Sequence, residues 1–202
     1  SSAASDVYKR QGELSAMNAI AGSLAENVPV ISIVGVPATK TIENKTCVHH
    51  NFQDVDYHAC YEAHKHVTAA AAFLTRDNAK MEIDRVLKTF VKERKPVYIA
   101  VPLDIAKMEI SDKEVSYDWI SDEETLRLVS NKIAAKINNA QKPVILGDLL
   151  VKRFDSRIEY KEFVEKTRIP TTNFLMGTNL IDMDYDLYLG CLLYTSDAAD
   201  DK

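Results

Sequence analysis

The order of apolar and polar residues in the first part of the chain predicts a helix followed by a strand. Apolar side chains recur at helical spacing, which predicts a helix over residues 15–26: Leu14, Met17, Ala21 and Leu24. Residues 30–36 form a short apolar, β-branched run closed by Gly35 and Pro37, which is typical of a buried strand. Residues 38–57 have no clear period and are expected to form a long loop.

A second helix and strand are predicted further along. Residues 67–74 are apolar and fit either a strand or a helix. Asn78 can cap the next helix, which has one apolar face: Ile83, Val86, Leu87, Phe90 and Val91. The pair Lys95-Pro96 ends that helix, and residues 97–101 read as another buried strand.

The same order appears again in the second half. Residues 104–121 are polar and mixed, with Trp119 as the main apolar anchor, and are expected to link two domains. Asp122 then caps a helix with an apolar face: Leu126, Val129, Ile133 and Ile137. After Lys142-Pro143 come a strand at 144–148, a helix at 158–167 and a strand at 170–175.

Helices that alternate with short apolar strands predict an α/β fold with doubly wound parallel sheets. We expect two incomplete Rossmann-like domains, the first over residues 12–108 and the second over residues 122–190. Residues 109–121 are expected to form the linker.

The two ends of the chain are related to each other in an unusual way. One set of codons for residues 1–11 has a reverse complement that, shifted by one base, translates as CLLYTSDAADD. The chain ends at residues 191–202 with CLLYTSDAADDK. We therefore expect both ends to be translated sequencing adapters, which removes Cys191 from any chemical argument.

Composition narrows the class of partner. The net charge of −5 argues against a nucleic acid or an anionic membrane surface as partner. No apolar run approaches the roughly 20 residues that a membrane span needs. The cysteines Cys47, Cys60 and Cys191 have no paired spacing, which favours a reducing, cytoplasmic location.

Four segments together resemble one enzyme family. They are GELSAMNAIAGS at 12–23, AENVPVISIVG at 25–35, His49-His50 with DVDY at 54–57, and EIDRVLKTFVKERKPVYIAVPLD at 82–104. Their order is similar to that of the thiamine-diphosphate-dependent 2-oxo-acid decarboxylases that act on pyruvate, indolepyruvate or branched-chain substrates. The similarity is weaker over residues 142–182.

The resemblance implies a three-domain enzyme that binds thiamine diphosphate and Mg²⁺ and forms a homodimer or homotetramer. Residues 12–108 match the later part of the pyrimidine-binding domain, and residues 122–190 match the start of the central domain. The glutamate that activates the cofactor is expected upstream of Gly12, and the Mg²⁺ motif in a C-terminal domain. The chain alone is therefore expected to be inactive.

The resemblance also assigns roles to single residues. His49 and His50 match the adjacent histidines that face the substrate and transfer protons, which suits a side chain with an unperturbed pKa of about 6.5. Glu13 lies in a motif near the cofactor, although it equally suits the first turn of a helix. Val55 stands where relatives have glycine, so we expect the turn there to avoid positive φ.

Three alternatives remain open at this point. The five histidines between positions 49 and 66, together with Cys47 and Cys60, could bind zinc, although their spacing is irregular. An acetolactate-synthase-like carboligase is a second enzyme class, but those relatives lack the histidine pair. A non-catalytic α/β binding module is the third, although no glycine-rich phosphate loop is present.

Overall fold

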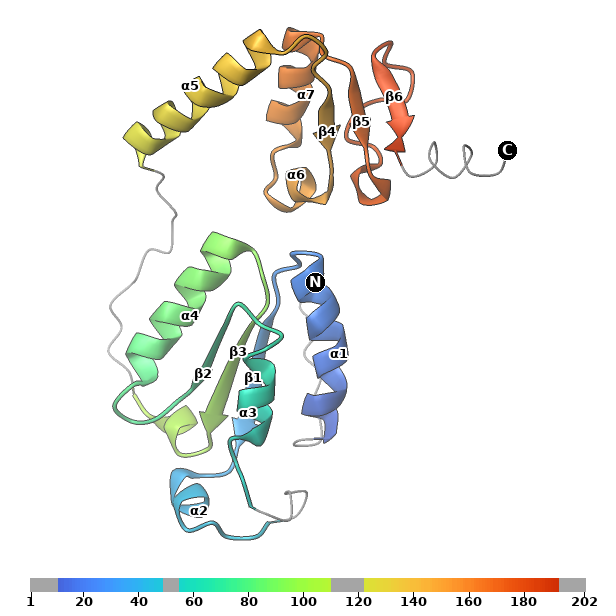
Figure 1. Ribbon diagram of the computed structural model, residues 1–202. Helices are drawn as coiled ribbons and strands as arrows, with labels where there is room; N and C mark the ends of the chain where they lie inside the picture. Colours follow the sequence, from blue (N-terminus) through green and yellow to red (C-terminus); the bar gives the residue numbers. More distant parts are fainter. Residues whose placement is uncertain (1–10, 49–54, 110–121, 193–202) are drawn as a thin grey trace. The chain divides into compact units, whose positions relative to one another are not determined.

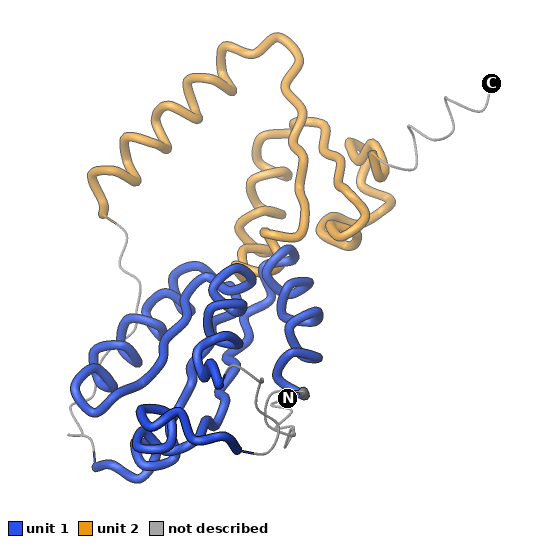
Figure 2. Tube along the Cα trace, turned by 60° about the horizontal axis from the view of Figure 1, so that its bottom comes forward, with its two compact units in different colours: residues 1–119 blue, residues 120–202 orange. Residues whose placement is uncertain are grey.

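The computed structural model describes residues 11–48, 55–109 and 122–192. The chain divides into two compact units, residues 1–119 and residues 120–202 (Figure 2). The division lies within the range expected for the linker. Because residues 110–121 lie outside the described residues, the linker itself stays a prediction.

In the described residues of the first unit, three strands form a parallel sheet and helices connect them along the chain (Figure 1). Its elements are α1 (Gln11–Ala25), β1 (Ile31–Val36), α2 (Thr39–Glu43), α3 (Ala59–His64), β2 (Ala70–Phe73), α4 (Ala79–Glu93), β3 (Val97–Pro102) and the 3-10 helix η1 (Ile105–Lys107). The strand order is β1-β3-β2, and Val97 is in register with Ile31 on one side and Ala70 on the other. This is the parallel α/β architecture that the sequence predicted.

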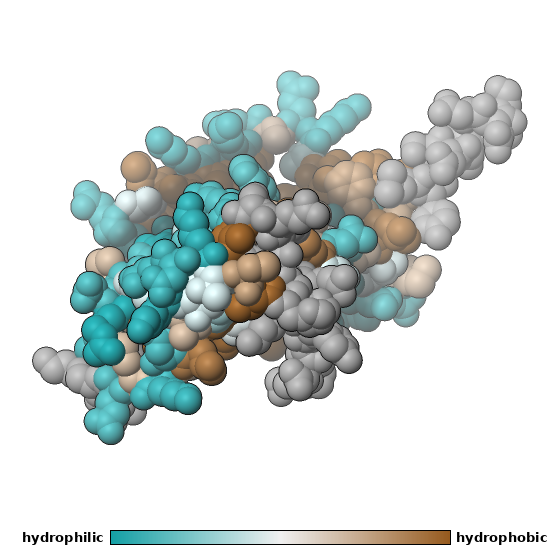
Figure 3. Space-filling view, turned by 90° about the horizontal axis from the view of Figure 1, so that it is seen from below, coloured by the Kyte–Doolittle hydropathy of each residue, from teal (hydrophilic) through white to brown (hydrophobic). Residues whose placement is uncertain are grey.

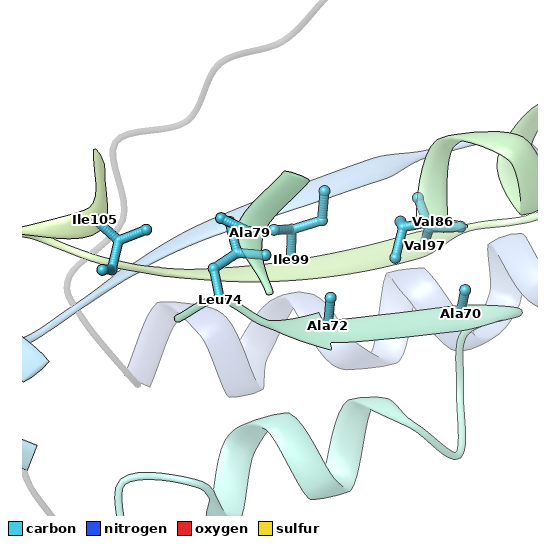
Figure 4. Close-up of a cluster of buried hydrophobic side chains, with 8 residues drawn as sticks. All are labelled: Ala70, Ala72, Leu74, Ala79, Val86, Val97, Ile99 and Ile105. Atoms are coloured by element: carbon cyan, nitrogen blue, oxygen red, sulfur yellow. The ribbon is translucent and has the colours of Figure 1, made fainter. Parts of the chain in front are cut away.

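Helices cover both faces of this sheet. Figure 4 shows one face, where side chains from β2, β3, α4 and η1 form the core while α1 and α3 lie on the other side of the strands. The core cluster consists of Ala70, Ala72, Leu74, Ala79, Val86, Val97, Ile99 and Ile105. Val86 is fully buried, and burial of a side chain of this size stabilises the fold by about 1.5–3 kcal/mol.

The central strand β3 presents alternate residues to the two faces. Val97 and Ile99 point into the core under α4. Because successive side chains of a strand point to opposite faces, Tyr98 between them points toward α1 and α3. Tyr98 is fully buried there and contacts residues of both helices.

The first strand is less buried than its sequence suggested. We expected residues 30–36 to be buried on both faces, but Ile33 is 69% exposed and Ile31 is also exposed. The reason is that β1 lies at the edge of the described sheet and pairs with β3 alone. Exposed hydrophobic residues are also seen on the face drawn in Figure 3, where brown, hydrophobic residues reach the surface between teal, hydrophilic ones.

The second unit is also built on a parallel sheet, with strand order β4-β5-β6. Its elements are α5 (Glu123–Asn139), β4 (Ile145–Gly147), α6 (Leu149–Arg153), α7 (Arg157–Thr167), β5 (Thr171–Asn173), the 3-10 helix η2 (Leu175–Gly177) and β6 (Tyr188–Cys191). A Cβ atom at Gly147 would lie 2.3 Å from the hydroxyl oxygen of Tyr160, so glycine leaves room for the tip of the Tyr160 side chain of α7 against β4.

The two expected helix caps behave differently. The carboxylate of Asp122 accepts a hydrogen bond from the backbone N–H of Thr125 at 3.1 Å, which confirms the cap of α5. Asn78 makes no side-chain cap on α4, and its side-chain oxygen instead accepts from the N–H of Thr75 at 2.7 Å. Within the described residues, every helix is too short or too polar to cross a membrane.

Candidate active-site framework

The loops that follow β1 and β3 are tied together beyond the carboxyl ends of these strands. Asp104 follows β3, and its carboxylate accepts a hydrogen bond from the backbone N–H of Thr39 at 2.8 Å. This hydrogen bond holds the pKa of Asp104 below its ordinary value. Open α/β sheets bind ligands at the carboxyl ends of their strands, so the bond braces the edge of the sheet where a site is expected.

The two histidines predicted to be catalytic, His49 and His50, lie outside the described residues. The chain on either side of them is described. The hydroxyl of Tyr57 donates to the carbonyl oxygen of Thr46 at 2.5 Å, and the side chain of Tyr57 is only 4% exposed. The positions that carry the histidine pair are therefore bracketed by two residues that are fixed to each other.

Val55 adopts a backbone conformation that its sequence did not predict. We expected the absence of glycine to keep this turn out of positive φ, but φ of Val55 is 57°. The expectation was wrong because the chain keeps the left-handed conformation that glycine favours and places a β-branched side chain in it. Such a residue raises the energy of the fold by about 1–2 kcal/mol.

Glu13 lies in the first turn of α1 but turns its carboxylate into the interior of the unit. The side chain accepts a hydrogen bond from the hydroxyl of Tyr98, and Glu13 is only 7% exposed. The position fits the expected helix start, since an acidic residue there suits the helix dipole. A role of Glu13 in cofactor binding stays a prediction.

His64, at the end of α3, completes a buried polar cluster with Glu13 and Tyr98. Its Nδ1 atom lies 2.8 Å from the carbonyl oxygen of Cys60 and 3.9 Å from Oε1 of Glu13. Its ring stacks on that of Tyr98, with 4.3 Å between the ring centroids and 23° between the planes. We refer to these three residues as the Glu13–His64–Tyr98 cluster.

This cluster shows what sequence reasoning missed. The resemblance assigned no role to His58, His64 or His66. His58 and His66 are exposed, and the ring of His58 rests on Phe73 with 4.4 Å between centroids. Nothing in the sequence marked His64 as the partner of Glu13, because the two lie in different helices. In the described ranges, no three His, Cys, Asp or Glu side chains are grouped so that they could hold a metal ion.

In the second unit, polar side chains hold the loops after the strands in place. The ammonium group of Lys152 donates to the carbonyl oxygens of Met176 at 2.8 Å and Thr178 at 2.5 Å. The hydroxyl of Tyr160 lies 2.8 Å from Oγ1 of Thr171, and burial raises the pKa of Tyr160. Both contacts are structural links between a helix and the chain at or beyond β5.

Comparison with known proteins shows which class of protein this chain resembles. Residues 130–202 match the family described as thiamine pyrophosphate enzyme, central domain. The chain is 32% identical to pyruvate decarboxylase isozyme 2 of Saccharomyces cerevisiae over 91% of its length. It is 32% identical to an alpha-keto-acid decarboxylase of Mycobacterium avium over 89% of its length, and 33% identical to a pyruvate decarboxylase of Aspergillus parasiticus over 85%.

The second unit therefore matches the central domain of thiamine pyrophosphate enzymes, and its parallel α/β fold is consistent with that match. Over most of its length, the chain is similar to thiamine-diphosphate-dependent 2-oxo-acid decarboxylases, as a segment of such a protein would be. It spans about a third of the length of the curated relatives it matches, between 31% and 34%.

Near the predicted site, the described residues make structural contacts with one another. The carboxylate of Glu13, the residue expected near the cofactor, is occupied by Tyr98 and lies close to His64. What the unit offers is a braced sheet edge, through Thr39 and Asp104, and fixed flanks on either side of positions 49–54.

Proposed function

We propose that this chain works as part of an enzyme that converts a 2-oxo acid to an aldehyde and carbon dioxide with thiamine diphosphate. The observation that carries the proposal is similarity over 85–91% of the chain to proteins named pyruvate decarboxylase and alpha-keto-acid decarboxylase. The substrate is pyruvate, indolepyruvate or a branched-chain 2-oxo acid. None of the relatives described above is named as a carboligase or as a non-catalytic protein.

The chemistry of the reaction gives separate tasks to the cofactor and to the protein side chains. Thiamine diphosphate supplies, when bound, the electron sink that loss of carbon dioxide from a 2-oxo acid requires. In our proposal His49 and His50 give and accept protons at the substrate, because imidazole changes its protonation near neutral pH. The residues bracketing them, Thr46 and Tyr57, fix where this segment leaves and rejoins the fold.

The remaining parts of the proposal concern cofactor, assembly and location. Mg²⁺ would accompany the diphosphate, held mainly by residues beyond those of this chain. We also propose a homodimer or homotetramer in the cytoplasm. Exposed apolar side chains on β1 and α5 support burial against further protein, since soluble proteins rarely leave such groups uncovered: Ile31, Ile33, Leu126, Leu128, Val129 and Ile133.

The proposal is tested with protein produced from the complete coding sequence that contains this segment. The protein is given thiamine diphosphate, Mg²⁺ and pyruvate, indolepyruvate or a branched-chain 2-oxo acid, and aldehyde and carbon dioxide are measured. We expect aldehyde from at least one substrate and a loss of about 100-fold or more in rate for His49→Ala or His50→Ala. His66→Ala, at an exposed histidine in the same half of the chain, is the matched control. Acetohydroxy acid as the product would identify a carboligase instead.

A further inference from the structure

We propose that His64 is a positioning residue. Its pairing with Glu13 and its stacking on Tyr98 hold α3 in place, and α3 in turn holds the residues that bracket His49 and His50. The catalytic consequence rests on the proposed function, whereas the anchoring itself concerns only the fold of this chain.

The first observation is that packing alone does not explain a histidine at this position. His64 is 0% exposed, and its Nε2 atom is buried without a hydrogen-bond partner in the described part of the chain. An unsatisfied buried nitrogen is unfavourable by comparison with an apolar side chain of the same volume. The polar ring must therefore be favoured by its other contacts.

Those contacts join three elements. Nδ1 faces the carbonyl oxygen of Cys60 within α3 and, at 3.9 Å, the carboxylate of Glu13 from α1. The face of the ring lies against Tyr98 from β3, whose hydroxyl is bound to the same carboxylate. A buried carboxylate needs a donor near it, and the hydroxyl of Tyr98 supplies one, while the Nδ1 edge of His64 lies 3.9 Å from the same carboxylate.

The second observation is that α3 is short and is tied into the chain at both ends. After its last residue, the hydroxyl of Thr68 donates to the carbonyl oxygen of His64 at 2.7 Å. Before its first residue, the N–H of His58 donates to the carboxylate of Asp56 at 2.8 Å, and Tyr57 is bound to Thr46. A helix of six residues is marginal by itself, so its position depends on tertiary contacts such as those of His64.

The sequence places the histidine pair next to this anchor. His50 lies nine positions before Ala59, where α3 begins. A shift of α3 would move Tyr57 and, through its bond, the carbonyl oxygen of Thr46. His64 would therefore influence the histidine pair without contacting the substrate.

The test uses a spin label on Cys47, which is exposed and lies directly after Thr46. Cys191 is replaced by serine so that it cannot react, and Cys60 is buried. Label mobility and the hydrogen exchange of α3 amides are measured in the full chain and in two variants. His64→Asn keeps an N–H near the position of Nδ1, whereas His64→Leu keeps only the volume.

We expect His64→Leu to increase label mobility and to raise exchange in α3 about tenfold or more, while His64→Asn, which keeps the N–H but loses the ring stacked on Tyr98, should change both clearly less. Glu13→Gln, which leaves His64 in place, should act in the same direction as His64→Leu and keeps the test valid if the leucine variant does not fold. Unchanged mobility and exchange in both His64→Leu and Glu13→Gln would overturn the proposal, as would an asparagine variant as loose as the leucine variant. Neither label mobility nor hydrogen exchange depends on enzyme activity. The test can therefore reject the role of His64 in holding α3 whether or not the protein is a decarboxylase.

Discussion

The hydroxyl of Tyr98 donates a hydrogen bond to the carboxylate of Glu13, across a sequence separation of 85 residues. Both side chains are buried, one on the central strand β3 and the other in the first turn of α1. The bond therefore fixes the start of α1, in the GELSA motif, to the middle of the sheet.

Replacing Tyr98 by phenylalanine tests the value of this bond. We expect Tyr98→Phe to lower the free energy of unfolding by about 1–3 kcal/mol, because the carboxylate of Glu13 stays buried and loses a donor. Denaturant unfolding at neutral pH measures the change. Glu93→Gln, at an exposed glutamate of α4, should change the stability by less than about 0.5 kcal/mol. Equal stabilities for Tyr98→Phe and the unmodified chain would show that the bond contributes nothing.

The left-handed conformation of Val55 predicts a stabilising substitution. Val55→Gly removes a penalty of about 1–2 kcal/mol and adds a backbone entropy cost of about 0.5–1 kcal/mol, so the stability should rise by up to about 1.5 kcal/mol. Thermal unfolding gives the sign. Val28→Gly, at a valine with ordinary φ, should instead lower the stability. A destabilised Val55→Gly variant would argue against strain at this turn.

Even the smallest side chain at position 147 is expected to destabilise the second unit. Gly147→Ala puts a Cβ atom 2.3 Å from the hydroxyl oxygen of Tyr160, which must move and give up its contact with Thr171. We expect a loss of about 1–3 kcal/mol in the stability of the second unit. Gly22→Ala is the control, since no atom lies within 4 Å of its Cβ and alanine favours a helix by about 1 kcal/mol. The two variants should change the unfolding midpoint in opposite directions.

The bond between Asp104 and Thr39 predicts a dependence on pH. The pKa of Asp104 is lowered in the folded state, mainly by the backbone N–H of Thr39. Its stabilising effect is therefore complete above the ordinary value of 3.8 and is lost as the pH falls through the lower, folded value. Unfolding of Asp104→Asn should depend less on pH below about 4 than unfolding of the unmodified chain. Asp77→Asn, at an exposed aspartate, should leave that dependence unchanged.

Elements with a strong apolar pattern could be predicted from the sequence. Strand β3 and helix α4 were both predicted. A strand buried on both faces has a continuous apolar sequence, and a helix buried on one face has apolar residues at helical spacing. Residues 67–74 resolved into strand β2, which is short and rich in alanine and so has no clear period. The short helices α2, α3 and α6 and the strand β6 were missed, since elements of four to six residues carry little periodic signal.

The site could be predicted only in part, for a physical reason. Local motifs predicted roles for Glu13 and the histidine pair, and these roles stay predictions. The same motifs gave no sign of the partners of Glu13. Contacts between Glu13, His64 and Tyr98 depend on how three separate elements pack, and no local spacing encodes that arrangement. The burial of β1 was overestimated because its sequence cannot tell an edge strand from a central one.

The most direct test of the decarboxylase assignment is a chimaera, in which this segment replaces the matching part of a similar protein. Residues 12–190 would replace the aligned segment of pyruvate decarboxylase isozyme 2 of Saccharomyces cerevisiae, which is 32% identical over 91% of the chain. The measured quantity is the release of aldehyde and carbon dioxide from pyruvate. We predict that the chimaera binds thiamine diphosphate and decarboxylates pyruvate, and that His49→Ala or His50→Ala abolishes this activity. A folded, cofactor-binding chimaera that forms no aldehyde, or whose activity survives both substitutions, would contradict the account.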